Sequence, residues 1–111
     1  MGTCVTTKSQ ERQAVIGYEQ TIQRAFSDVS DALIGYEKYH AVRERQEQSV
    51  KDLQESVQVS FTRYRGGTTN YLAVLDSQRS LFDAELTLAQ ARNNEYQSLI
   101  QFYKALGGGW Q

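Results

Sequence analysis

The residue types that usually carry out chemistry in proteins are sparse in this sequence. It contains one histidine, His40, and one cysteine, Cys4, which are too few for a structural zinc site or an internal disulfide. His40 has no set of partners suited to acid–base catalysis, so we interpret it as structural. Cys4 does not follow the run of apolar residues that precedes a lipidated cysteine. The composition therefore predicts no enzyme, no metal site and no cofactor.

Charge and hydropathy argue against two further classes of protein. Twelve Lys and Arg against thirteen Asp and Glu give a net charge of −1, which is not the basic surplus that nucleic-acid binding needs. No window approaches the ~18 apolar residues of a membrane-spanning helix, and residues 1–10 lack the apolar region of a signal peptide. We expect a soluble chain that has no signal peptide and binds no nucleic acid.

The elements that position the side chains follow from the glycines and from the absence of proline. Because proline breaks helix interiors, a chain without it permits long uninterrupted helices. The glycines that punctuate the sequence are Gly66 with Gly67, and the run at 107–109. We therefore expect a disordered segment, or one foreign to the fold, over 1–10, helices over 11–64 and 71–106, a turn over 65–70, and a Gly-rich end over 107–111.

Apolar residues recur at three- and four-residue steps in both expected helices, which is the period of a coiled coil. The second helix carries two such stripes, and a helix with two apolar stripes packs against more than one neighbour. The stripe of the first helix fades near Arg43 and Glu47, which we expect to form a solvated or salt-bridged face. The stripes consist of Val15, Tyr18, Ile22, Ala25, Phe26, Val29, Ala32, Leu33, Tyr36, Val50, Leu53, Val57, Phe61 and Tyr64 in the first helix, and of Leu72, Leu75, Phe82, Leu86, Ala89, Tyr96, Ile100 and Tyr103 beside Val74, Leu81 and Leu88 in the second.

These features predict an all-α fold, a long antiparallel helical hairpin. Either Gly66 or Gly67 can take the left-handed conformation that ends a helix, and Thr68, Thr69 or Asn70 can cap the next one. The two arms differ in length, and the apolar stripe continues at Val15, beyond the reach of the second helix. We therefore expect lateral partners and an oligomer rather than a stable monomer.

Three segments together resemble the TolC-like outer-membrane efflux proteins, in particular the branch of lipoprotein channels. The turn region, RYRGGTTNYLAVLDSQRSLF over residues 63–82, resembles the periplasmic hairpin of that family. AFSDVSDAL over residues 25–33 resembles the start of its long helix, and YKALGGGW over residues 103–110 resembles its end. The similarity covers about residues 14–110, with the three segments in the family's order.

The resemblance implies a part of a trimeric channel that exports drugs, metals or other small molecules unchanged. In that family, long helical hairpins form a periplasmic tunnel, and their tips meet a periplasmic adaptor protein joined to an inner-membrane pump. The resemblance assigns the adaptor-contacting tip to Arg65, Gly66, Gly67, Thr68, Thr69 and Asn70, and an acidic ring at the tunnel entrance to Asp76. From the residues alone, Asp76 is equally a solvated acid at a helix start.

Two alternatives remain open at this point. One is a free-standing, soluble coiled-coil module for oligomerisation or interaction. The other is the hairpin of a periplasmic adaptor, although adaptors carry flanking Gly- and Val-rich strands that this sequence lacks.

Overall fold

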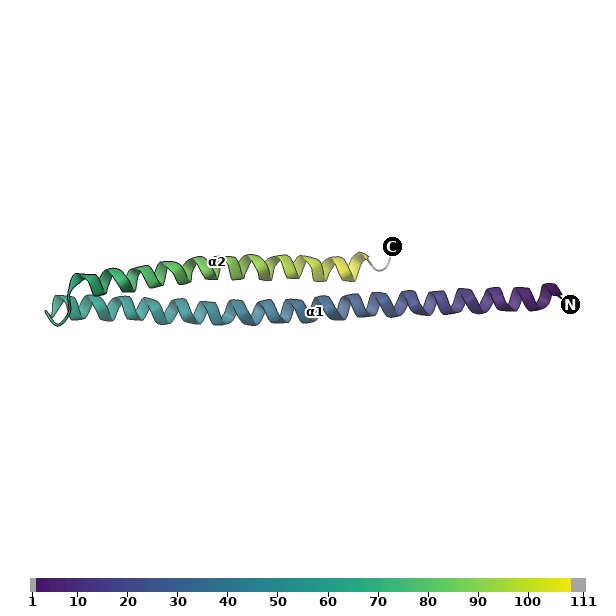
Figure 1. Ribbon diagram of the computed structural model, residues 1–111, viewed down its shortest axis with the longest axis horizontal. Coiled ribbons are helices and arrows are strands. Elements are labelled where there is room, and N and C mark those ends of the chain that lie inside the picture. The colour runs from purple at the N-terminus through teal and green to yellow at the C-terminus, as the bar shows by residue number, and fades with distance from the viewer. Residues whose placement is uncertain (1, 109–111) are drawn as a thin grey trace.

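The chain forms one long antiparallel pair of helices in a computed structural model that describes residues 2–108 (Figure 1). Helix α1 spans Gly2–Arg65 and helix α2 spans Tyr71–Gly108, and the described residues contain no strand. The molecule measures 99 × 17 × 14 Å. The predicted all-α helical hairpin is confirmed.

The helix ends lie close to the expected ones at the turn and differ from them at the chain ends. Helix α1 begins at Gly2, whereas a disordered segment, or one foreign to the fold, was expected over 1–10. This segment contains no proline, so nothing in its backbone chemistry stops the helix from extending through it. Helix α2 continues to Gly108, two residues past the expected end. Residues 109–111 of the Gly-rich end lie outside the described residues.

The turn uses Gly67 to end α1. Gly67 has a φ of +77°, the one positive φ among the described residues. Its N–H donates to the Tyr64 carbonyl at 3.0 Å, and the Thr68 N–H donates to the Arg63 carbonyl at 2.9 Å. These two bonds form a Schellman motif, which satisfies carbonyls that the helix end would otherwise leave unpaired. Gly66 keeps an ordinary helical bond to the Thr62 carbonyl.

Helix α2 begins with a side-chain cap. The Ala73 N–H donates to Oδ1 of Asn70 at 3.1 Å. Asn70 is therefore the N-cap residue of α2. Of the three candidate caps in the sequence, Asn70 is therefore the one used. Thr68 instead donates its hydroxyl to the Arg63 carbonyl at 3.1 Å, back towards the end of α1.

The two helices pack through one heptad stripe on each. On α2 this inner seam is spaced alternately by three and four residues, and all of its members are buried or half-buried. Val74 is fully buried, and Val50 of α1 belongs to the same core. Large and small side chains alternate along the seam, which allows the helices to approach closely. The inner seam comprises Val74, Ser77, Leu81, Ala84, Leu88, Ala91, Glu95, Ser98, Phe102 and Ala105.

Helix α1 extends well past the end of α2 (Figure 1). Every residue from 6 to 24 is exposed, and burial on α1 begins at Ala25. Yet Val15, Tyr18 and Ile22 continue the same heptad stripe that α2 covers farther along, with exposed fractions of 55%, 69% and 51%. The protruding part of α1 thus carries an apolar stripe without a partner among the described residues.

The different backbone states of the two turn glycines predict different effects of alanine. At Gly67, alanine would be forced into the left-handed region, which costs an L-residue about 1–2 kcal/mol. At Gly66, an added Cβ would meet the Thr62 carbonyl oxygen at 3.4 Å and the Arg63 carbonyl oxygen at 3.7 Å, both ordinary contacts, and alanine would also lower the entropy of the unfolded chain.

We expect Gly67→Ala to lower the free energy of unfolding by about 1 kcal/mol, and Gly66→Ala to leave it unchanged or raise it slightly. Urea unfolding followed by circular dichroism measures both. Equal losses for the two variants would contradict the assignment of the Schellman glycine to Gly67.

Candidate functional site

The six tip residues expected to contact a partner all lie in the connection between α1 and α2 or at its edge. Arg65 is the last residue of α1, and Asn70 directly precedes α2. Five of the six are exposed, and Thr69 is half-buried. The two glycines leave backbone uncovered, which permits close approach by another chain. The tip is therefore accessible, with the cationic side chain of Arg65 at its edge.

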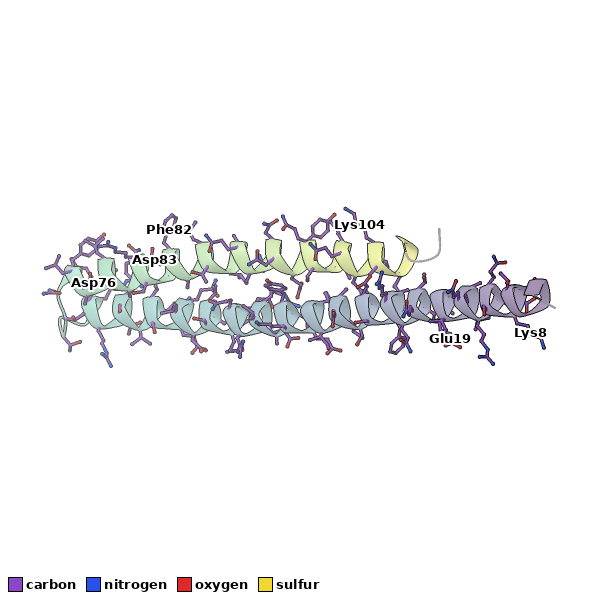
Figure 2. The ribbon with its side chains drawn as sticks, turned by 45° about the vertical axis from the view of Figure 1, so that its right-hand side comes forward. Lys8, Glu19, Asp76, Phe82, Asp83 and Lys104 are labelled. Carbon is purple, nitrogen blue, oxygen red and sulfur yellow. The ribbon has the colours of Figure 1, made fainter. Side chains whose placement is uncertain are left out.

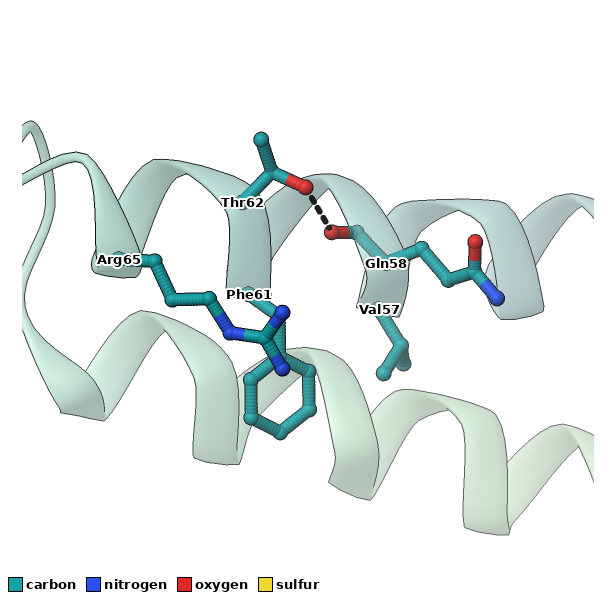
Figure 3. Close-up of a pocket in the computed structure, with 5 residues that line it drawn as sticks. All are labelled: Val57, Gln58, Phe61, Thr62 and Arg65. Carbon is teal, nitrogen blue, oxygen red and sulfur yellow. Dashed lines mark hydrogen bonds between the residues drawn. The ribbon is translucent and has the colours of Figure 1, made fainter.

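Aromatic and cationic groups lie on the last turns of α1 next to the tip. The guanidinium of Arg65 lies 5.8 Å from the centroid of the Phe61 ring, a cation–π distance. These two residues line a shallow depression with Val57, Gln58 and Thr62 (Figure 3). The Thr62 hydroxyl donates to the backbone carbonyl of Gln58 at 3.0 Å. Next to the tip, the side of α1 thus combines an apolar ring with a positive charge.

Asp76 lies in the second turn of α2 and is exposed. No hydrogen bond or ion pair engages it among the described residues, and Gln78 and Arg79 are exposed as well. Figure 2 labels Asp76 near the tip end of the molecule, so its carboxylate is available to solvent or to a neighbouring chain.

A cluster of charged side chains interrupts the seam about midway along α2. We define the polar cluster as His40, Arg43 and Glu47 of α1 with Arg92 and Glu95 of α2. The Arg43 Nε donates to Glu95 Oε2 at 3.0 Å, and a terminal nitrogen of Arg43 lies 3.1 Å from Glu47 Oε2. Arg92 donates to Glu47 Oε1 at 3.3 Å. Two carboxylates and two guanidiniums therefore link the helices in alternation.

Burial differs within the cluster. The side chains of Arg43 and Glu95 are 17% and 20% exposed, whereas Arg92 at its edge is 61% exposed. The contacts with Glu95 raise the pKa of Arg43 above its ordinary value, chiefly through their hydrogen bond. The hydrogen bond from Arg92 lowers the pKa of Glu47, and the nearby positive charge of Arg43 lowers it further. Both shifts favour the charged forms.

His40 has more partners than the sequence indicates. Its Nδ1 lies 2.9 Å from Glu95 Oε2, and its Nε2 lies 3.0 Å from Glu44 Oε1. The Tyr36 ring lies 5.8 Å away, centroid to centroid. The contact with Glu95 therefore ties His40 of α1 to α2. The signal in the sequence was the seven-residue spacing that places Glu95 in line with Val74, Leu81 and Leu88.

The fuller apolar stripe of α2 faces away from α1. This outer seam is also spaced alternately by three and four residues, and all ten of its members are exposed. It lies two residues out of step with the inner seam, so about 160° separates the two around the helix. The two stripes therefore lie on nearly opposite faces of α2, and the expectation that they lie side by side is wrong. The outer seam comprises Leu72, Leu75, Arg79, Phe82, Leu86, Ala89, Asn93, Tyr96, Ile100 and Tyr103.

The exposed fractions along the outer seam are large for apolar side chains. Leu72 is 66% exposed, Phe82 59% and Tyr103 65%. Figure 2 shows Phe82 and Lys104 projecting from the side of α2 opposite α1. An exposed stripe of this length, apolar except at Arg79 and Asn93, is typical of an interaction surface.

Two kinds of site are not found among residues 2–108. No three His, Cys, Asp or Glu side chains are arranged to hold a metal ion. Neither helix contains a stretch long and apolar enough to cross a membrane.

Comparison with known proteins finds a matching family and several related sequences. The model of the family described as outer membrane efflux protein matches residues 6–108. The cation efflux system protein CusC of Escherichia coli is 40% identical over 101 residues, which are 91% of this chain and 22% of that protein. The toluene efflux pump outer membrane protein TtgF of Pseudomonas putida is 40% identical over 96 residues, 86% of this chain and 20% of that protein.

A third relative is the pyoverdine export outer membrane protein OpmQ of Pseudomonas putida. It is 36% identical over 104 residues, which cover 94% of this chain and 22% of that protein. The chain thus spans about a fifth of the length of the curated relatives it matches.

The geometry of the polar cluster predicts that Glu95 contributes more to stability than Glu44. Removing Glu95 leaves the partly buried guanidinium of Arg43 without its inter-helix partner, and an unpaired charge of this kind is costly. We expect Glu95→Ala to lower the melting temperature by several degrees. Glu44→Ala, a matched change at a side chain that is 61% exposed, should lower it much less. Similar losses in the two variants would contradict an inter-helix role for Glu95.

The lowered pKa of Glu47 predicts a loss of stability in acid. A carboxyl whose pKa is lower in the folded than in the unfolded state stabilises the fold above its ordinary value of 4.5. That contribution disappears as the pH falls through the lower, folded-state pKa. We expect the free energy of unfolding, measured from pH 7 down to pH 3, to decrease below about pH 4.5, and to decrease less in Glu47→Gln. An unchanged pH profile in Glu47→Gln would contradict the shift.

Proposed function

The chain belongs to the outer membrane efflux protein family, and from that premise we propose that it forms part of the wall of a periplasmic α-helical tunnel. In this proposal, the hairpin tip docks a periplasmic adaptor protein that is joined to an inner-membrane pump. The chain is then located on the periplasmic side of the outer membrane, in a homo-oligomeric channel. Its role is to line a path for export and not to catalyse a reaction.

The observation that carries the proposal is the pair of seams on α2. A helix in the wall of a cylinder has one neighbour on each side, so it needs two apolar stripes on nearly opposite faces. The inner seam is covered by α1, and the outer seam is entirely exposed. The pattern supports a helix that packs between α1 and a further helix.

The tip supports the docking part of the proposal through its accessibility. Gly66 and Gly67 leave exposed backbone, and Arg65, Thr68, Thr69 and Asn70 surround it with hydrogen-bonding groups. Asn70 and Thr68 already use side-chain atoms within the turn, which holds the tip in a fixed shape before a partner arrives. A preformed tip lowers the ordering cost of binding.

Asp76 supports a role at the tunnel entrance because it is exposed and has no partner among the described residues. In a symmetric oligomer, one copy of this carboxylate from each subunit would form an acidic ring, which favours cations. The related proteins are named for export of cations, toluene and pyoverdine. The proposed cargo is therefore small molecules and ions as a class.

Docking at the tip is tested by a change in the glycine pair. We expect Gly67→Asp to weaken binding of a periplasmic adaptor protein to the full chain by roughly tenfold or more, since it adds a charged side chain where the partner approaches. The measurement is sedimentation equilibrium of the chain with and without the adaptor. Gly107→Asp is the matched control. Gly107 lies at the other end of α2, and an added Cβ there meets nothing within 4 Å.

Two results would contradict docking at the tip. One is an adaptor that binds the native chain and Gly67→Asp equally well. The other is the absence of any adaptor binding, which would favour the alternative of a coiled-coil interaction module. Circular dichroism of each variant separates lost binding from a lost fold.

A further inference from the structure

We propose that Tyr71 is a positioning residue for docking at the hairpin tip. Its ring packs against the ring of Tyr64 across the turn, and this contact holds the start of α2 in the orientation that a docking partner meets. The role rests on the docking function proposed above, and it adds a residue outside the six of the tip.

The two tyrosine rings are in contact although both are exposed. Their centroids lie 5.4 Å apart and their planes are inclined by 56°, which is a favourable arrangement for an aromatic pair. Tyr64 is the next-to-last residue of α1, and Tyr71 is the first residue of α2. The pair therefore joins the two helices at the point where the chain leaves one and enters the other.

The hydrogen bonds of the turn do not make this connection between the helices. The amides of residues 66–68 all donate back to carbonyls of α1, so the first part of the turn is fixed to that helix. Asn70 instead accepts from the Ala73 amide, so it is fixed to α2. Each part of the turn is thus bonded to its own helix, and the ring contact spans the two.

Two large side chains next to the turn are held against rings of α1. The guanidinium of Arg65 lies over the Phe61 ring (Figure 3), and Tyr71 packs against Tyr64. The shape that the tip offers to a partner depends on where these side chains are held. A residue that keeps the tip in that shape lowers the ordering cost of binding without contacting the partner itself.

The inner seam separates the order of the tip from the stability of the hairpin. Val74 lies in the first turn of α2 and is fully buried, so the helices stay paired without the ring contact. Helix ends fray when nothing holds them. We therefore expect the loss of the Tyr71 ring to loosen the tip and to leave the hairpin folded.

Hydrogen exchange of the free chain tests the effect on the tip. The Ala73 amide, which donates to the Asn70 cap, reports on the order of the first turn of α2. We expect it to exchange roughly two- to tenfold faster in Tyr71→Ala, the range that corresponds to the loss of an aromatic pair, and at the native rate in Tyr71→Phe. Alanine is the better helix former, so a faster exchange comes from the lost ring and not from helix propensity.

Calorimetric titration of the full chain with the periplasmic adaptor protein tests the effect on docking. We expect the dissociation constant to rise roughly two- to tenfold in Tyr71→Ala and to keep its native value in Tyr71→Phe, because phenylalanine retains the ring. In a Tyr64→Ala background, Tyr71→Ala should cause no further loss, because the two rings act as a pair. Tyr96→Ala is the matched control: Tyr96 is also an exposed tyrosine of α2, at 64%, and lies in its far half.

The outcomes distinguish a failure of this role from a failure of docking. An adaptor that does not bind the native chain would contradict docking, and the role of Tyr71 with it. An adaptor that binds the native chain and Tyr71→Ala equally well would overturn the positioning role alone. Unchanged exchange of the Ala73 amide in Tyr71→Ala, or a loss of binding in Tyr71→Phe as large as in Tyr71→Ala, would overturn it as well. Circular dichroism confirms that each variant keeps its helices.

Discussion

The structure depends on a limit set by geometry: a helix in a two-helix hairpin can bury only one stripe against its partner. Helix α2 places its alternating large and small residues on that stripe, from Val74 to Ala105, and α1 covers them. Many of the other large apolar side chains stay exposed, Leu72, Phe82 and Tyr103 among them. Hydrophobic burial is the main favourable contribution to folding. Contacts with other helices would therefore stabilise this hairpin further by burying its exposed apolar side chains.

Charged residues within the seam are the other constraint on the pairing. Arg43 and Glu95 occupy heptad positions between apolar layers, and their hydrogen bond at 3.0 Å joins the two helices. A polar layer in a coiled coil contributes less to stability than an apolar one, but a shifted register would leave its charges unpaired. The ion pair between Arg92 and Glu47 also joins the two helices, and a shifted register would break it as well. The Schellman turn at Gly67 and this cluster therefore set the alignment from two places along the hairpin.

The exposed outer seam connects the fold to the function. In the proposed tunnel it packs against a helix of a neighbouring hairpin. The heptad spacing suits this contact, because it fits any antiparallel helix with a matching stripe. The tip does not take part in this contact and remains accessible.

The sequence by itself determined the hairpin and its turn. The absence of proline, the Gly66-Gly67 pair and the three–four spacing are local signals, and each acts through backbone conformation or helix periodicity. The family followed from the segments around the turn and at the two ends. The roles of the tip residues and of Asp76 stay proposals.

Only the tertiary structure decided which stripe of α2 faces α1. Leu72, Phe82 and Tyr103 belong to the more apolar stripe, yet the less apolar stripe with Val74 is the buried one. Hydrophobicity alone therefore does not predict which stripe is buried. The buried face is set by the small residues between the large ones, which allow close packing, and by the direction in which α2 leaves the turn. The contact between His40 and Glu95 likewise could not be predicted from the sequence. The two residues are 55 positions apart and meet only once the hairpin has formed.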